Sequence, residues 1–227
     1  MKVCFSGFGS PIAVDNAAVS VLEVQNRALF TRVCWSLASG LGLDAIEPYS
    51  LWDDDAELKA AAQFLVVASP LALPWDDKAF SGGLSAGFER MVLEDEAVRR
   101  EIEEAFAILQ SRLSRVALGF DSDYAFGIDW ELKRYLRTYG FGVDIADDEP
   151  LIDKLIKFLM MARDASLKKT LLFVNLKLFL TENEFDLFLE QALFSRLSVL
   201  LVENVCDAPL RPQERKYTID QDLLESW

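Results

Sequence analysis

Residues 168–205 give the strongest indication of the fold, because two short apolar runs there flank a helical segment. The first run, residues 170–176, is rich in Leu, Phe and Val, which is typical of a strand buried on both faces. Thr181 and Glu184 have the spacing of a capping box and predict a helix start. The second apolar run is residues 198–203. Two parallel strands need such a crossover, so we expect a βαβ unit in an α/β layer.

The N-terminal third carries the remaining signals of this layer. A Gly- and Pro-containing turn between two short apolar segments predicts a hairpin. Asn26 is placed to cap a helix that runs to about residue 39 and ends at Gly40. In the tail, KYTID predicts a last edge strand. Further strands are expected at residues 2–5, 12–14, 19–24, 46–51 and 64–68.

Between residues 76 and 140 the apolar period changes from two to 3.6, which indicates helices. We expect one helix interrupted at Gly82-Gly83, a long amphipathic helix after it, and a third helix at DWELKRYLRTY. GFGVDI then predicts a strand, and Pro150 begins another helix. The predicted organisation is a discontinuous α/β head, residues 1–75 plus 141–227, with an α-helical lobe at residues 76–140.

Composition excludes several classes of protein. Hydrophobic residues make up 52% of the 227 residues, as expected for a packed globular chain. The chain has no histidine, and its three cysteines, Cys4, Cys34 and Cys206, form no CxxC pair. A Cys/His zinc site and a histidine-dependent catalytic pair are therefore excluded. No apolar run approaches the roughly 20 residues that span a bilayer, and no secretory signal is visible, so we expect a cytoplasmic protein without a membrane anchor.

The net charge of −14 weighs against nucleic-acid binding when it is taken alone, because phosphate contacts need Lys and Arg. Net charge, however, does not say where the 23 basic residues lie. An acidic protein can gather them on one face or around the hole of a ring.

Nucleotide-binding signals are weak or missing. GFGS is too short for a dinucleotide fingerprint, and no G-x-x-x-x-G-K-[ST] motif occurs. The three acids in WDDDAEL are interpreted as a solvated turn or a helix start rather than as a metal site.

Several of these segments, in this order, resemble the small DNA-binding adaptation protein of type II-A CRISPR systems. The opening MKVCF and VSVLEVQNRALFTRV, the α/β–helical–α/β order and the length are similar to that family. The central unit carries the remaining matches: a lysine pair, a strand ending in Phe-Val-Asn, a Leu-Thr helix start and a strand ending in an acid. These are Lys168, Lys169, Phe173, Val174, Asn175, Leu180, Thr181 and Glu203.

The resemblance implies a P-loop-like α/β head that has lost its nucleotide site, with an inserted α-helical lobe. It also implies a homotetrameric ring that binds ends of double-stranded DNA, slides along the duplex, depends on calcium and serves spacer acquisition without being an enzyme. The expected partners are the CRISPR integrase and the RNA-guided nuclease of the same system. In this chain Asn175 stands where a Walker-type enzyme would end its strand in an acid.

An acidic loop between the long helix and the next one is the candidate calcium site. Calcium prefers several oxygen ligands on flexible backbone, and the family's sites lie near this region. The alternative is that these acids begin or end helices. A second cluster, residues 147–149, is interpreted as the N-terminus of the following helix. The candidate ligands are Asp121, Asp123, Asp129 and Glu131.

Sequence-independent DNA binding needs basic side chains repeated along a groove, and a tetramer would present each of them four times. Singly, each is better explained as part of a solvated face, and the candidates gain weight only as a group. Two other functions stay open: an acidic protein-interaction scaffold, and a P-loop-like nucleotide hydrolase or kinase. The candidates for DNA contact are Arg99, Arg100, Arg112, Arg115, Lys133, Arg134, Arg137, Lys154, Lys157, Lys168, Lys169 and Lys177.

Overall fold

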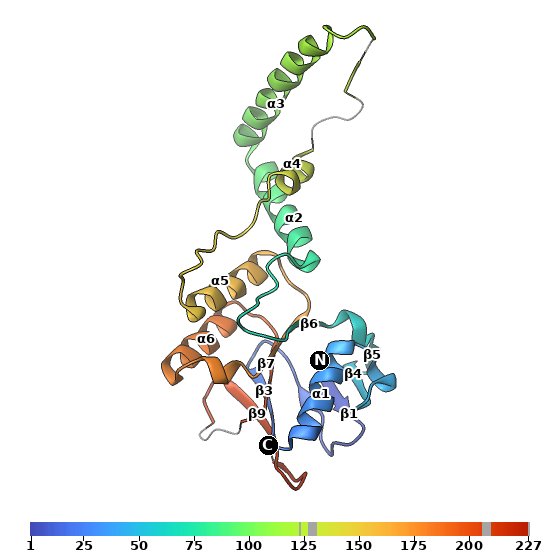
Figure 1. The fold of residues 1–227 in the computed structure, drawn as a ribbon, viewed down its shortest axis with the longest axis vertical. Helices are drawn as coiled ribbons and strands as arrows, with labels where there is room; N and C mark the ends of the chain where they lie inside the picture. The colour runs from blue at the N-terminus through green and yellow to red at the C-terminus, as the bar shows by residue number, and fades with distance from the viewer. Residues whose placement is uncertain (123, 127–130, 206–209, 227) are drawn as a thin grey trace.

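The computed structural model describes residues 1–122, 124–126, 131–205 and 210–226 as a mixed α/β fold with two sheets (Figure 1). The larger sheet has the order β10-β9-β3-β8-β7-β6, and its neighbours are parallel except for β10 and β9. Its strands are β3 (Val19–Val24), β6 (Phe64–Val67), β7 (Thr170–Val174), β8 (Val199–Glu203), β9 (Glu214–Ile219) and β10 (Glu225–Ser226). The smaller sheet is antiparallel, in the order β2-β1-β4-β5. Its strands are β1 (Lys2–Phe5), β2 (Ile12–Ala13), β4 (Tyr49–Asp53) and β5 (Ala56–Leu58).

The predicted βαβ unit is confirmed. Strands β7 and β8 are parallel neighbours, and α6 (Glu182–Phe194) connects them. Both halves of the capping box are present: the Glu184 amide donates to Thr181 Oγ1 at 3.4 Å, and Glu184 Oε2 accepts from the Thr181 amide at 2.8 Å. The box satisfies backbone groups that would otherwise be unpaired at the helix start.

The central strands are buried on both faces, as their continuous apolar runs predict. Leu171 and Phe173 belong to one core cluster, together with α5 (Leu151–Asp164) and α6. Leu172, between them, belongs to the other cluster, with α1 (Arg27–Ser39) and the small sheet. Successive side chains of a strand point to opposite faces, so an alternating run would have left one face polar.

A chain of aromatic contacts runs through the first core cluster. The Phe80 ring meets Phe158 on α5 at 5.2 Å, and Phe158 lies 6.3 Å from Phe173 on β7. Phe173 in turn lies 5.4 Å from Phe188 on α6. Phe80 belongs to α2 (Lys78–Glu94) and is the buried residue of that helix, so it fixes the start of α2 to the core.

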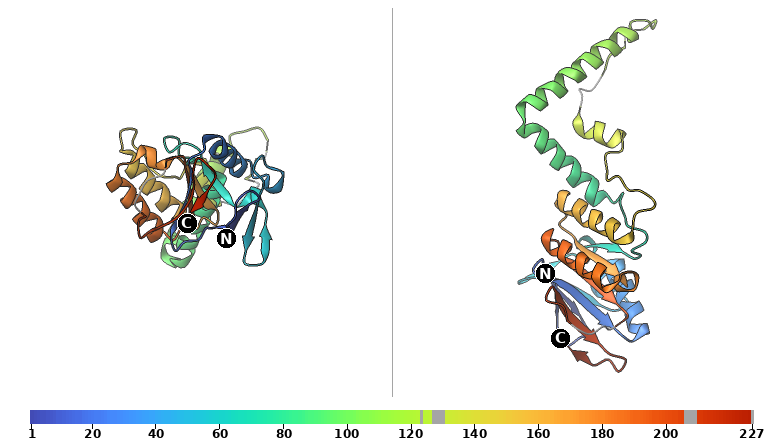
Figure 2. Two further views of the ribbon diagram at one scale, coloured as in Figure 1. Left: turned by 90° about the horizontal axis from the view of Figure 1, so that it is seen from below. Right: turned by 90° about the vertical axis from the view of Figure 1, so that its left-hand side faces the viewer.

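Beyond Phe80 the chain leaves the sheets as a long helical arm (Figures 1 and 2). The arm consists of α2, α3 (Glu96–Ala117) and α4 (Leu132–Thr138). Asp95, with extended backbone, separates α2 from α3 and caps α3 through the amides of Ala97 and Val98. No residue of α3 is buried. Among the described helices, none is long and apolar enough to cross a membrane.

The predicted interruption at Gly82-Gly83 is wrong, because α2 is continuous through both glycines. Gly83 serves close packing instead. A Cβ at this position would lie 2.0 Å from the carbonyl oxygen of Ala165, at the end of α5. Only glycine therefore lets the two backbones approach so closely.

The strand predicted at residues 140–145 is also wrong, since this segment has no strand partner. The apolar residues at alternate positions of this segment pack without forming a strand. Phe141 contacts the Phe88 ring at 5.0 Å, and Val143 packs against the first core cluster. Two smaller differences concern the start of one strand and the position of another in its sheet. The strand predicted at 46–51 begins at Tyr49, and the predicted edge strand is β9, which lies between β3 and β10.

Candidate nucleic-acid interface

The predicted basic residues of the long helix lie along the exposed arm. Arg100, Arg112 and Arg115 are exposed on α3, and no described carboxylate lies within 4.0 Å of their side chains. Arg99 differs, because its Nε lies 3.8 Å from Glu103 Oε1, one helical turn away. Three guanidinium groups of the arm are thus open to a phosphate ligand.

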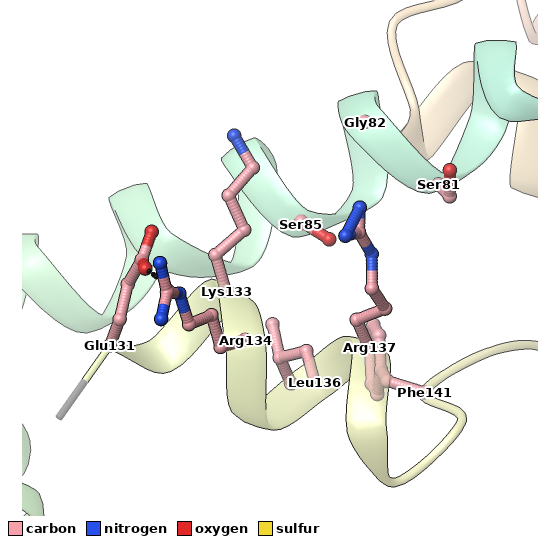
Figure 3. A pocket seen from close by; sticks show the side chains of 9 residues that line it. All are labelled: Ser81, Gly82, Ser85, Glu131, Lys133, Arg134, Leu136, Arg137 and Phe141. Carbon is pink, nitrogen blue, oxygen red and sulfur yellow. Dashed lines mark ion pairs between the residues drawn. The ribbon is translucent and has the colours of Figure 1, made fainter. Parts of the chain in front are cut away.

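The basic residues of α4 face α2 across a cavity of about 340 Å³ (Figure 3). Arg134 is neutralised there by Glu131, with Nε and Oε2 2.7 Å apart. Lys133 and Arg137 have no described carboxylate within 4.0 Å. In Figure 3 both side chains extend from α4 toward α2, so this cavity gathers two positive charges that no described carboxylate pairs with.

The lysines of α5 have a structural task. Lys154 Nζ donates to the carbonyl oxygen of Asp147 at 2.9 Å, and Lys157 Nζ donates to that of Asp144 at 3.2 Å. Lys157 is also paired with Glu149, and this contact lowers the pKa of the Glu149 carboxyl. Together they fasten residues 144–149 onto α5, and within the second acidic cluster the Glu149 carboxylate is neutralised by Lys157.

The three lysines predicted around β7 differ in how exposed they are. Lys168 is exposed and Lys169 is half-buried just before the strand. Lys177 lies after it, and only 9% of its side chain is exposed. Its Nζ lies 3.2 Å from Glu23 Oε1 and 3.1 Å from Glu214 Oε1, so its charge is committed inside the protein.

Lys177 belongs to a charged cluster at the carboxyl ends of β3 and β8. Lys216 Nζ also contacts Glu23 Oε1, at 3.3 Å. Glu203, which is fully buried, accepts from the Lys177 amide at 3.3 Å through Oε1. Burial raises the pKa of the Glu203 carboxyl to about 8, although the Lys177 amide and ammonium act in the opposite direction.

Asparagines close the same edge of the sheet. The Asn204 amide donates to Asn175 Oδ1 at 2.9 Å, and Asn204 Nδ2 donates to the Val24 carbonyl at 2.8 Å. Asn175 has a left-handed backbone, with φ of 52°. Open parallel sheets bind ligands at this edge, where the connections diverge to opposite faces. Here side chains of the protein itself link the carboxyl ends of β3, β7 and β8. Of these residues, the sequence by itself indicates Asn175, as the residue that replaces an acid at the end of β7.

The candidate calcium ligands are not brought together in the described part of the chain. Asp123 and Asp129 lie outside the described residues. Asp121 is exposed beyond the end of α3, and Glu131 is paired with Arg134. No group of three or more acidic or cysteine side chains among the described residues is placed to hold a metal ion. Asp121 and Glu131 by themselves do not fit calcium, which takes six to eight oxygens.

The sequence and the fold of the chain were compared with known proteins. A family model described as CRISPR-associated protein (Cas_Csn2) matches residues 46–223. No curated protein matches the sequence. Among solved structures, 19 chains match. One is the crystal structure of Stu0660 of Streptococcus thermophilus, with a TM-score of 0.54 and 19% identity. The match covers 89% of this chain and 68% of that one, and it shows a shared fold.

Proposed function

The chain belongs to the CRISPR-associated Cas_Csn2 family, the adaptation proteins of type II-A systems, and we propose that it is a non-enzymatic ring that binds the ends of double-stranded DNA during spacer acquisition. The observation that carries the DNA-binding part is the set of basic groups without a described carboxylate partner on the arm. These are Arg100, Arg112, Arg115, Lys133 and Arg137.

Their placement explains how a protein of net charge −14 binds phosphates. All five belong to α3 and α4, outside the sheets (Figure 1). Non-specific DNA binding arises from such phosphate contacts and needs no base recognition. Lys168 and Lys169 are secondary candidates before β7. Lys154, Lys157 and Lys177 are left out of the proposed contact set, because each holds another part of the chain.

The closed carboxyl edge of the large sheet supports a binding role without nucleotide chemistry. We propose that residues 1–75 plus 141–227 form a P-loop-like head and residues 76–140 an inserted lobe. In such a head a nucleotide would sit at this edge, on a phosphate loop. The sequence has no such loop, and at this edge Asn204 is hydrogen-bonded to Asn175 and to the Val24 carbonyl. A nucleotide hydrolase is therefore disfavoured.

Self-association through the arm is the second part of the proposed function. An amphipathic helix normally buries its apolar stripe. Along α3, however, Val98, Leu109 and Leu113 are 41%, 49% and 45% exposed. A second copy of the chain would cover this stripe, and a closed homotetramer would repeat the basic groups four times around its hole.

Calcium belongs to the proposed function through the family resemblance. Asp121, Asp123, Asp129 and Glu131 remain the candidate ligands. When bound, the ion would neutralise acidic side chains close to the DNA-contacting arm. To bind the metal, the Glu131 carboxylate would have to leave its ion pair with Arg134, which is formed at 2.7 Å. The integrase and the RNA-guided nuclease of the same system are the proposed protein partners.

The decisive experiment measures binding of the purified protein to linear and closed-circular duplex DNA, with calcium or with a chelator, over a range of salt. We expect calcium-dependent binding that weakens steeply with salt and requires a free end. Absence of binding in every condition would refute DNA binding and leave the acidic scaffold as the better explanation. Equal binding to closed circles would refute the ring threaded from an end.

The assembly is tested separately by light scattering after size-exclusion chromatography. Leu109→Asp places a charge in the exposed stripe of α3, and we expect it to lower the mass of the assembly. Ser111→Asp adds the same charge to the opposite face of the helix and is the matched control. A wild-type protein that elutes with the mass of one chain would contradict the ring.

A further inference from the structure

The cavity between α2 and α4 has the composition of an anion site (Figure 3). Lys133 and Arg137 contribute two positive charges that no described carboxylate balances within 4.0 Å. Acidic residues outnumber basic ones by 37 to 23 in this chain, so an uncompensated basic pair in one cavity is a local exception. An anion would remove the repulsion between the two cations.

The opposite wall adds neutral hydrogen-bond donors. Ser81 and Ser85 lie one turn apart on α2, and both line the cavity, although Ser81 Oγ already donates to the Lys78 carbonyl at 3.4 Å. Gly82 lies beside them, and the space that a Cβ would fill there has no heavy atom within 4 Å. Figure 3 shows the Arg137 guanidinium reaching toward α2 beside Ser85. Two cations of α4 and the Ser85 hydroxyl of α2 thus line one cavity.

The third basic residue of the cavity is not part of this site. Arg134 is already paired with Glu131, at 2.7 Å. The pair lies at the end of the cavity away from Ser81 (Figure 3). The floor is apolar, made of the buried Leu136 and of Phe141. Lys133 lies between this pair and Arg137, and the end of the cavity with Arg137, Ser85 and Ser81 contains no described carboxylate (Figure 3).

We propose that this cavity binds one phosphate group of the DNA backbone, an inference that rests on the proposed DNA-binding function. Arg137 supplies a planar, bidentate donor, Lys133 supplies a point charge nearby, and the Ser85 hydroxyl donates from α2. Because the donors come from both helices, a bound phosphate bridges α4 to α2. The short α4 is then fixed in the orientation that DNA binding requires.

The first test uses inorganic phosphate as the probe and thermal unfolding as the readout. Phosphate is expected to raise the Tm of the wild-type protein above that in chloride at equal ionic strength, because a ligand of the folded state stabilises it. The double variant Lys133→Gln plus Arg137→Gln should not show this increase. Arg90→Gln, an exposed arginine of α2 outside the cavity, should keep it. An equal increase in the double variant would overturn the site.

The second test uses linear duplex DNA and separates the site from the general function. The double variant is expected to bind at least roughly tenfold more weakly, because each charged hydrogen bond that it loses contributes about tenfold or more. Its dependence of log K on log salt should be shallower by about 0.9 for each phosphate that the variant no longer neutralises. Arg137→Lys, which keeps the charge, should retain most of the salt slope.

The outcomes distinguish the two proposals. If DNA binds the wild type and the double variant with the same affinity and salt slope, the phosphate site is wrong and DNA binding stands. If DNA binds neither, but phosphate raises the Tm only when Lys133 and Arg137 are present, DNA binding is wrong. The cavity is then a site for a free phosphate compound.

Discussion

Replacing Glu203 with glutamine perturbs one buried carboxyl at the end of β8. Glu203 is fully buried, and its Oε2 has no hydrogen-bond partner in the described part of the chain. Burial raises the pKa of this carboxyl from 4.5 to about 8, so the side chain is a neutral acid at pH 7. Glutamine keeps the oxygen that accepts from the Lys177 amide and stays neutral at every pH.

The magnitude follows from proton linkage. Between pH 4.5 and pH 8 the folded protein retains a proton on Glu203 that the unfolded chain has released. Stability from this group is fully present below the unfolded pKa and is lost as the pH rises toward the folded pKa. The slope is about 1.4 kcal/mol per pH unit in the middle of this window. Allowing for curvature at both ends, wild type loses roughly 3 kcal/mol relative to Glu203→Gln between pH 5 and pH 8.

Urea unfolding of both proteins at several pH values measures this difference. Comparing the two cancels the titration of groups that they share. Glu190→Gln removes an exposed carboxylate from α6 and controls for the change in net charge. If the difference in unfolding free energy between wild type and Glu203→Gln is constant from pH 5 to pH 8, Glu203 is ionised in the folded state and our electrostatic explanation is wrong.

Three further substitutions or reactions test other parts of the structure. Gly83→Ala should destabilise the protein by about 2 kcal/mol in thermal unfolding, since its Cβ would meet the Ala165 carbonyl at 2.0 Å. Gly82→Ala, in open space one residue earlier, should stabilise by about 0.5–1 kcal/mol, and equal effects would contradict the packing role. Thr181→Ala should cost about 1 kcal/mol because the cap is removed, and no measurable decrease in stability would contradict it. Burial raises the pKa of the Cys34 thiol to about 12, so alkylation of Cys34 at pH 8 should accelerate on unfolding, and rapid reaction of the native thiol would refute this.

The candidate site could be predicted from the sequence only in part. Residue types and helical spacing placed the basic residues on the correct segments, because helices form from local patterns. They could not say which charges remain available. Lys154 and Lys157 hold the 144–149 segment, whereas Lys133 and Arg137 face an open cavity. The lysine contacts reach residues 7 and 13 positions away, and the cavity forms between α2 and α4, which are far apart in the chain.

The central βαβ unit, the burial of its strands on both faces and the cap at Thr181 all follow from the order of the residues alone. These features depend on side-chain period and on bonds within a few residues. The continuity of α2 through Gly83 and the absence of a strand at residues 140–145 depend instead on how distant segments pack. Gly83 packs against Ala165 at the end of α5, and Phe141 packs against Phe88 of α2, so each outcome involves a residue more than fifty positions away. Local propensity yields to such contacts because burial against a neighbour contributes more free energy than the propensity of a single residue.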